Sequence, residues 1–359
     1  ILIGLVGSEM CIRDSTKIAE CRNLIVKQLG EMGKMSSHIA DEIKYATNYD
    51  FDCEKRIINA LKRNEIYIYD AVVVKNQYDM LDVTLYTHKN YDKEKMNEIL
   101  RIISKETGQR MQLYSAHTGN KKNSMRELHF VVRPQVKIHA EALCMPAAGN
   151  QLSGDSYCFM DLPDGRTFLV LSDGMGTGRR ASEQSNAVVR LMELYVKSGI
   201  DISSAVSMVN MMLTSGAADV MTASIDICSV NRHEKRALFV KMGAMPSVIV
   251  GPERSRVIEI NQPPAGVTSE LNDLYCKMTE CEVASGECIV LYTDGVYDAF
   301  KMGGVNQKVF YEYLASVVRK YDGDEKRCHK IAEEVLKKAS GFVEDTEGDD
   351  MSVAVIEIL

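Results

Sequence analysis

Acidic residues in the second half of the chain stand next to apolar runs, where they could act together. Asp173 and Asp294 each follow an apolar run and a Ser or Thr, and each precedes a glycine. Asp155 comes just before one predicted strand, and Asp349–Asp350 just before another. A lone Asp-Gly step after a strand is usually a hairpin turn, because both residues tolerate the positive φ that such turns require. Four acidic positions at strand ends favour a shared site instead.

The chemistry of such a site follows from its charge. Carboxylates that are brought together repel one another and raise one another's pKa unless cations neutralise them. Oxygen ligands without His or Cys suit Mg²⁺ or Mn²⁺, which keep bound waters and leave room for a phosphate, and they disfavour zinc. Two such ions would activate a water for in-line attack on a phosphoryl group. The acids therefore predict phosphoester hydrolysis by two metal ions without a covalent enzyme intermediate.

The elements that must position these acids are mostly strands, with a helical pair between them. Alternating and apolar runs predict strands at 136–144, 156–161, 166–172 and 351–358, six more strands between 222 and 293, and helices at 178–198, 202–215 and up to about 339. Runs of strands interrupted by helices predict antiparallel sheets with helices outside, rather than alternating βαβ units.

These motifs resemble the motif series of the PPM-type, or type 2C, metal-dependent serine/threonine protein phosphatases. They occur in the family's order as Gly154-Asp155, SDGMGTG at 172–178, YTDGV at 292–296 and DDMS at 349–352. The DGMGTG loop with the Arg-Arg-Ala that follows resembles the stage II sporulation protein E branch in particular. The resemblance spans 134–359 and implies an α+β fold, an α-β-β-α sandwich of two antiparallel sheets flanked by helices.

The resemblance also implies a role for each site residue. Asp173 would be the carboxylate that bridges two Mn²⁺ or Mg²⁺ ions, and Gly174 would add its backbone carbonyl. Asp294 and Asp349 would complete the shell of one ion. Asp155 would act on the other ion, directly or through a water. The expected catalytic residues are thus Asp173, Asp294 and Asp155.

Some assignments stay open. Asp350 stands where relatives often have Asn, so either Asp349 or Asp350 could be the ligand. The basic phosphate-binding residue and the general-acid His of eukaryotic members have no counterpart in this chain. Arg179 and Arg180 are candidates for binding the substrate phosphate, because a helix start already favours an anion. A solvated helix start is the equal alternative.

The first part of the chain contains no chemical motif. Residues 1–15 show no periodicity and are expected to be a truncated or non-native start. Residues 16–50 carry apolar residues at three- and four-residue steps, which predicts an amphipathic linker helix and a candidate homodimer contact. Residues 51–133 predict a small α+β regulatory domain, and Pro134 separates it from the expected phosphatase domain at 134–359.

Composition limits the partners. A net charge of -7 argues against nucleic acid, and no apolar run reaches the roughly 18 residues needed to cross a bilayer. The ten cysteines include no C-x-x-C pair, which indicates reduced thiols in the cytoplasm.

The resemblance implies a phosphorylated anti-sigma-factor antagonist as the substrate, in the control of sporulation. It further implies that this chain is the cytoplasmic portion of a membrane-anchored protein that meets the division machinery. A catalytically weak phosphatase-fold interaction module, or scaffold, is the alternative function.

Overall fold

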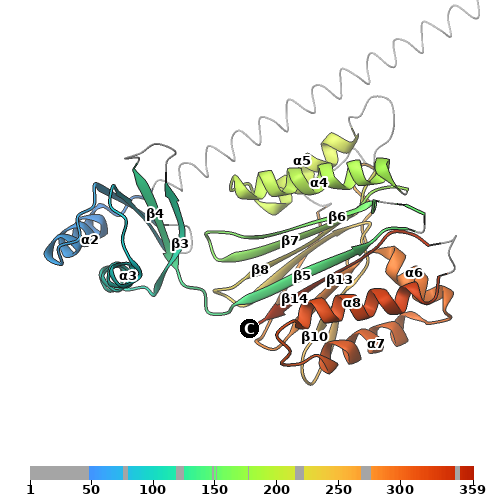
Figure 1. Ribbon diagram of the computed structural model, residues 1–359. Coiled ribbons are helices and arrows are strands. Elements are labelled where there is room, and N and C mark those ends of the chain that lie inside the picture. The colour runs from blue at the N-terminus through green and yellow to red at the C-terminus, as the bar shows by residue number, and fades with distance from the viewer. Residues whose placement is uncertain are drawn as a thin grey trace, which may run out of the picture.

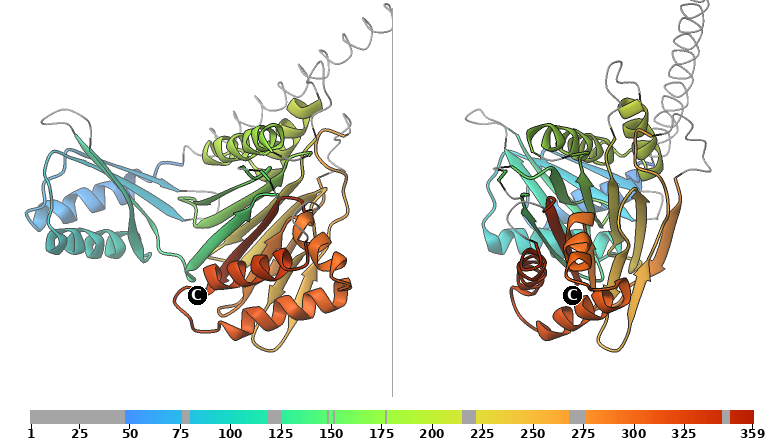
Figure 2. Two further views of the ribbon diagram at one scale, coloured as in Figure 1. Left: turned by 45° about the vertical axis from the view of Figure 1, so that its right-hand side comes forward. Right: turned by 90° about the vertical axis from the view of Figure 1, so that its right-hand side faces the viewer.

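The computed structural model describes residues 48–75, 80–118, 125–147, 149–150, 152–176, 178–214, 222–267, 276–343 and 348–359. The expected start at 1–15 and nearly all of the expected helix at 16–50 lie outside the described residues. Figures 1 and 2 show a small unit of one sheet and two helices beside a larger layered unit.

The small unit is a four-stranded antiparallel sheet with α2 (Phe51–Arg63) and α3 (Lys93–Thr107) packed against it. Both helices begin at an aspartate: Asp50 accepts a hydrogen bond from the backbone N–H of Cys53, and Asp92 accepts one from that of Lys95, which satisfies amides that a helix start leaves free. The strands lie in the order β1 (Asp70–Lys75), β2 (Leu81–Thr87), β4 (Arg126–Val132) and β3 (Met111–Thr118).

The larger unit is built on two five-stranded antiparallel sheets. The first sheet has the order β11 (Ser255–Ile258), β10 (Ser247–Val250), β13 (Cys288–Tyr292), β14 (Met351–Ile358) and β5 (Ile138–Met145). The second has the order β12 (Met278–Glu282), β9 (Arg236–Met242), β8 (Ile225–Asn231), β7 (Arg166–Asp173) and β6 (Asp155–Asp161).

Helices cover the outer face of each sheet. The second sheet is covered by α4 (Arg179–Lys197) and α5 (Ile202–Thr214), and the first by α6 (Asp294–Met302), α7 (Gln307–Lys320) and α8 (Arg327–Ser340) (Figure 1). This α-β-β-α order confirms the predicted fold class. No helix in the described part of the chain is long and apolar enough to cross a membrane.

Apolar side chains fill the space between all four layers. Leu169, Phe239 and Ile289 are fully buried between the two sheets. β13 and β14 are buried along their whole length, because they lie in the middle of a sheet that is covered on both faces. Their continuous apolar runs therefore deliver Asp294 and Asp349–Asp350 to fixed places at the strand ends.

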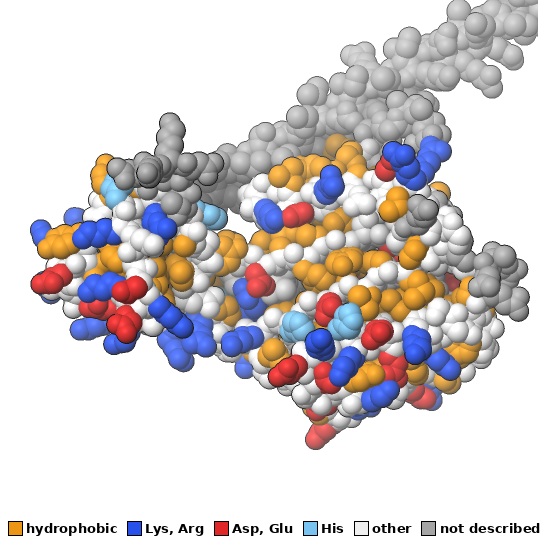
Figure 3. Space-filling view, in the orientation of Figure 1, with side chains coloured by type: hydrophobic (Ala, Val, Ile, Leu, Met, Phe, Trp, Pro, Cys, Tyr) orange, Lys and Arg blue, Asp and Glu red, His pale blue; other side chains and the backbone are white. Residues whose placement is uncertain are grey.

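The edge strands β5 and β6 lie on one side of the sandwich. Figure 3 shows apolar side chains gathered in a band there, and Tyr157 of β6 is 40% exposed. The small unit contacts the far end of the same strand, where the hydroxyl of Tyr114 donates a hydrogen bond to the carbonyl of Asp161 at 2.9 Å. β6 thus connects the small unit to the end of the sandwich where Asp155 lies.

Candidate active site

The predicted acids gather at one end of the sandwich. Asp155 begins β6 and Asp173 ends β7, directly opposite it in the antiparallel register. Asp294 begins α6 just after β13, and Asp349 and Asp350 lie just before β14. Asp173 and Asp155 share a hydrogen bond, and the charges of Asp294 and Asp349 also act on Asp173. Segments that are far apart in the sequence therefore bring their carboxylates to one place.

Thr293 joins the two sheets at this end. Its hydroxyl donates a hydrogen bond to Oδ2 of Asp155 at 3.0 Å and accepts one from the backbone N–H of Ser352 at 2.9 Å. Its own backbone N–H donates to the carbonyl of Ser352 at 3.0 Å. Because Asp155 belongs to one sheet and Ser352 to the other, this buried threonine fixes the two strand ends relative to each other.

The backbone of Asp173 is held by Ser224, which lies just before β8. The N–H of Asp173 donates to the hydroxyl of Ser224 at 2.8 Å, and the N–H of Ser224 donates to the carbonyl of Asp173 at 2.9 Å. These bonds extend the pairing of β7 and β8 beyond the regular ladder. The backbone that carries the Asp173 carboxylate is therefore held by two hydrogen bonds on the β8 side of its strand.

The glycines after Asp173 and Asp294 are required by close packing. Neither Gly174 nor Gly295 has a positive φ, so the hairpin-turn interpretation is wrong for both steps. A Cβ on Gly174 would lie 2.1 Å from the carbonyl oxygen of Ala181 in α4, and one on Gly295 would lie 2.2 Å from that of Asp350. Each Asp-Gly step thus lets another segment approach the backbone beside a carboxylate.

The adjacent acids before β14 have different surroundings. Asp350 is 2% exposed, and its Oδ1 accepts a hydrogen bond from the backbone N–H of Ala147 at 2.8 Å. Asp349 is exposed, and its Oδ1 accepts a hydrogen bond from the N–H of Asp350 at 2.8 Å. The charge of Asp349 acts on Asp173, whereas that of Asp350 acts on Asp155.

The site has an excess of negative charge. The pKa of Asp173 is raised from an ordinary 3.8 to about 9, first by burial and then by the charges of Asp155 and Asp294. Burial raises the pKa of Asp155 to about 6, although hydrogen bonds from Ser352 and Thr293 oppose the change. Burial is also the main cause that raises the pKa of Asp349. Where no cation neutralises these carboxyl groups, they hold protons, which lowers the negative charge of the site.

The donor set fits a hard divalent cation. Oδ1 of Asp155 and Oδ2 of Asp350 are buried without a hydrogen-bond partner, which is costly unless a cation or water satisfies them. Within the described ranges, no three of these carboxylates bring oxygens within 4.8 Å of one another. Mg²⁺ and Mn²⁺ suit this spread, because they retain several waters and need few protein oxygens each.

The predicted phosphate-binding arginines lie in the first turn of α4. Nε of Arg179 donates to Glu183 at 2.9 Å, and the Arg179 side chain is 86% exposed. Its partner is thus a neighbour on the same helix and not one of the acids. Arg180 is exposed as well. Their role toward a substrate phosphate remains a prediction.

The sequence interpretation missed a buried ion pair beside the acids. Nζ of Lys241 lies 2.7 and 2.8 Å from the two carboxylate oxygens of Asp226, and it donates to the carbonyl of Met245 at 2.6 Å. Asp226 lines a small cavity together with Asp173 and Asp294, and Lys241 contacts Met245, which also lines it. The available signal was a charged residue within each of two neighbouring apolar strands, Asp226 in β8 and Lys241 in β9, which pair in register.

Two helix-covered antiparallel sheets, with an oxygen-rich acidic cluster at one end, define a PPM-type, or type 2C, phosphatase domain. A solved structure agrees with this class: the PP2C phosphatase domain with a fragment of the regulatory domain of SpoIIE from Bacillus subtilis. It is similar over 95% of this chain and 98% of that chain, with a TM-score of 0.68 and 21% identity. At this identity, the likeness establishes the fold.

The family model of Stage II sporulation protein E matches residues 163–359, and the chain belongs to this family. Two curated relatives, each named Stage II sporulation protein E, come from Bacillus subtilis and Priestia megaterium. They are 23% identical over 342 residues and 22% identical over 346 residues, in each case 95% of this chain. The chain spans 40% and 57% of their respective lengths.

Proposed function

We propose that this chain is a Mn²⁺- or Mg²⁺-dependent phosphatase that removes phosphate from phosphoserine or phosphothreonine in a protein. The observation that carries the proposal is the group of carboxylates around Asp173, whose pKa is raised to about 9. A site that holds protons on buried carboxylates near neutral pH is a site that divalent cations would stabilise. Membership of the Stage II sporulation protein E family supports the same activity.

Two divalent ions, when bound, would supply an activated water and neutralise the charge on the phosphoryl group. Asp173 would contact both ions, because it is the carboxylate on which the charges of Asp155, Asp294 and Asp349 all act. Asp294 and Asp349 would hold one ion, and the backbone carbonyl of Gly174 would contribute a further oxygen. Asp155 would hold the other ion or orient its water, with its own Oδ2 fixed by the hydroxyl of Thr293.

For the two adjacent acids, we assign Asp349 as the direct ligand and Asp350 as a positioning residue, whose unpaired Oδ2 would accept a hydrogen bond from a water. One oxygen of Asp350 is already used by the N–H of Ala147, and the side chain is nearly fully buried. Asp349→Asn should therefore weaken Mn²⁺ binding strongly without unfolding the chain. Asp350→Asn should lower the stability of the fold more than it lowers Mn²⁺ affinity. Calorimetric titration and urea unfolding of both variants would measure this, and the reverse order would contradict the assignment.

Substrate, partners and location rest on the family. The proposed substrate is a phosphorylated anti-sigma-factor antagonist in sporulation control. Because the chain spans about half of its relatives' lengths, we propose that it is the cytoplasmic part of a longer, membrane-anchored protein that meets the division machinery. Within it, 51–133 would regulate the phosphatase domain at 134–359, and 16–50 would form a homodimer contact.

The direct test is hydrolysis of a phosphoserine protein by the purified chain as Mn²⁺ is added. We expect turnover that requires the metal, and Asp173→Asn should lower it by about 100-fold or more, since several kcal/mol of charge stabilisation are lost. Asp298→Asn is the matched control, because Asp298 lies one turn after Asp294 on the same helix and pairs with Lys301 at the surface. A folded wild-type chain without metal-dependent turnover would favour the interaction module instead.

A further inference from the structure

A second cluster of metal-ligating side chains lies away from the acids. His139 on β5 pairs in register with Glu357 on β14, and Cys328 belongs to the first turn of α8 above them. The other ends of the same two strands lie next to Asp350. Six residues of strand separate the two ends, so the cluster lies roughly 20 Å from the acidic site.

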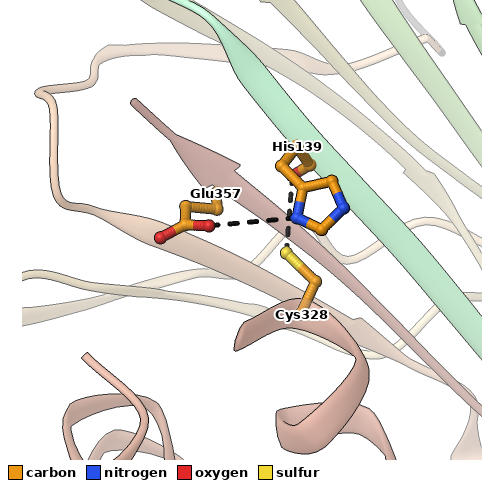
Figure 4. Close-up of side chains that lie close together, drawn as sticks. All are labelled: His139, Cys328 and Glu357. Atoms are coloured by element: carbon orange, nitrogen blue, oxygen red, sulfur yellow. Dashed lines mark hydrogen bonds and ion pairs between the residues drawn. The ribbon is translucent and has the colours of Figure 1, made fainter. Parts of the chain in front are cut away.

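The three side chains point toward one another (Figure 4). Their ligand atoms, which are an imidazole nitrogen, a thiol sulfur and a carboxylate oxygen, all lie within 4.8 Å of one another. Nδ1 of His139 is 4.0 Å from Oε2 of Glu357, and the thiol of Cys328 donates to the carbonyl of His139 at 3.5 Å. Three elements far apart in the sequence thus bring three different kinds of donor to one point.

We propose that His139, Cys328 and Glu357 bind one Zn²⁺ ion. Sulfur, nitrogen and oxygen donors together are a set that zinc accepts and that Mg²⁺ does not. Zinc bonds of roughly 2.0–2.3 Å place tetrahedral ligand atoms roughly 3.3–3.8 Å apart, so the side chains need to approach by only about 1 Å. A water would complete the fourth position on the His139 side, where the imidazole is 42% exposed.

The surroundings orient the carboxylate for this role. Nη1 of Arg327 donates to Oε1 of Glu357 at 3.0 Å, and this leaves Oε2 facing His139. Arg327 is itself buried, and its Nη2 donates to the carbonyl of Val318 at 3.3 Å. A buried partner that holds the second oxygen of a ligand is typical of metal sites, because it fixes the direction of the first oxygen.

The proposed ion would be independent of the catalytic ions. The acids offer oxygen alone, which suits Mg²⁺ or Mn²⁺, whereas this cluster includes a thiol and an imidazole. The ion would attach the start of α8 to the edge strand β5. Figure 3 shows histidine side chains at the surface in this region, so an ion could enter from solvent.

Co²⁺ is the probe for the test, because a thiolate ligand gives it a near-ultraviolet charge-transfer band that oxygen ligands do not give. The metal-free full chain is titrated with Co²⁺ in excess Mg²⁺, which keeps the acids occupied. We expect a band that saturates at one equivalent and disappears when Zn²⁺ is added. Cys328→Ser and His139→Gln should each abolish the band or weaken Co²⁺ binding by at least about 10-fold.

The matched control is His329→Gln. His329 follows Cys328 on α8 and pairs with Glu141 of β5 at 2.6 Å, so it has the same kind of partner but does not belong to the cluster. Its band should equal that of the wild type. The proposal is overturned if the wild type gives no band, or if the band survives in Cys328→Ser. If the circular dichroism spectrum shows that Cys328→Ser is unfolded, the result with His139→Gln decides whether the proposal holds. The half-exposed His139 side chain can be replaced without disturbing the core. Phosphatase activity does not enter the readout.

Discussion

Replacing Asp173 by asparagine should make the metal-free protein more stable while it removes activity. Asn has nearly the same shape as Asp but cannot ionise. In the wild type, Asp173 lies among Asp155, Asp294 and Asp349, and its pKa is raised from 3.8 to about 9. When folding raises the pKa of a carboxyl group, ionisation of that group lowers the stability of the folded state. Its penalty is therefore absent below about pH 3.8 and grows as the pH rises toward 9.

The size of the effect follows from the same pKa values. Each pH unit in this interval corresponds to about 1.4 kcal/mol, so the roughly three units between 3.8 and pH 7 give an upper limit of about 4 kcal/mol. Asp173 is partly exposed and shares a hydrogen bond with Asp155, which reduces the benefit of removing its charge. We expect a gain of about 2 kcal/mol at pH 7, or roughly 4–8 °C in Tm for a domain of this size.

The assay is thermal unfolding of the wild type and Asp173→Asn in EDTA, from about pH 5 to about pH 8, repeated with Mn²⁺. The difference in Tm should grow with pH, because only the wild type accumulates the penalty. With Mn²⁺ at about 100 times its Kd, the wild type should gain about 2.7 kcal/mol and the variant much less. The order of stability should therefore reverse when the metal is added.

Two results would refute this reasoning. One is a metal-free Asp173→Asn that melts at or below the wild-type temperature at pH 7, which would mean that the carboxylate stabilises the apo fold. The other is a Tm difference that does not change with pH, which would mean that the gain has another cause than ionisation. Asp298→Asn, an exposed acid on α6, should show neither the gain nor the reversal.

Two further substitutions test the surroundings of the site. Gly295→Ala places a Cβ 2.2 Å from the carbonyl oxygen of Asp350, so the backbone must shift. We expect the free energy of unfolding in urea to fall by about 1–3 kcal/mol and Mn²⁺ binding to weaken. Gly341→Ala, whose Cβ meets nothing closer than 3.4 Å, should change neither quantity. Lys241→Met leaves the buried carboxylate of Asp226 unpaired and should lower the free energy of unfolding by about 3–5 kcal/mol. Adding Asp226→Leu should restore most of this stability. A double variant as unstable as Lys241→Met would contradict this account.

Much of the fold could be predicted because its strands and helices carry strong local patterns. The last strand was predicted at 351–358 and is found there, since every residue of a central strand covered on both faces is apolar or closely packed. The bounds of α3 likewise have local signals, because Asp92 caps its start and Gly108 ends it. The order of strands within each sheet depends on long-range pairing, and local patterns contain no information about it.

The site was less accessible to sequence reasoning. The acids themselves could be found, because each stands at the end of an apolar run. The packing role of Gly174 and Gly295 could not be predicted, because the residues that approach them, Ala181 and Asp350, are brought near only by the fold. The Thr293 hydrogen bonds to Asp155 and Ser352 escaped notice for the same reason.

The place of β14 in its sheet has a consequence for how the protein is made. β14 lies between β13 and β5, and it pairs with β5 across about 200 positions of sequence. While the chain emerges from the ribosome, the first sheet therefore stays open until β14 has been synthesised. Long-range pairing of this kind is slow to form. Asp349 and Asp350 enter with the same strand, so the nascent chain cannot assemble its acidic site before its fold has closed.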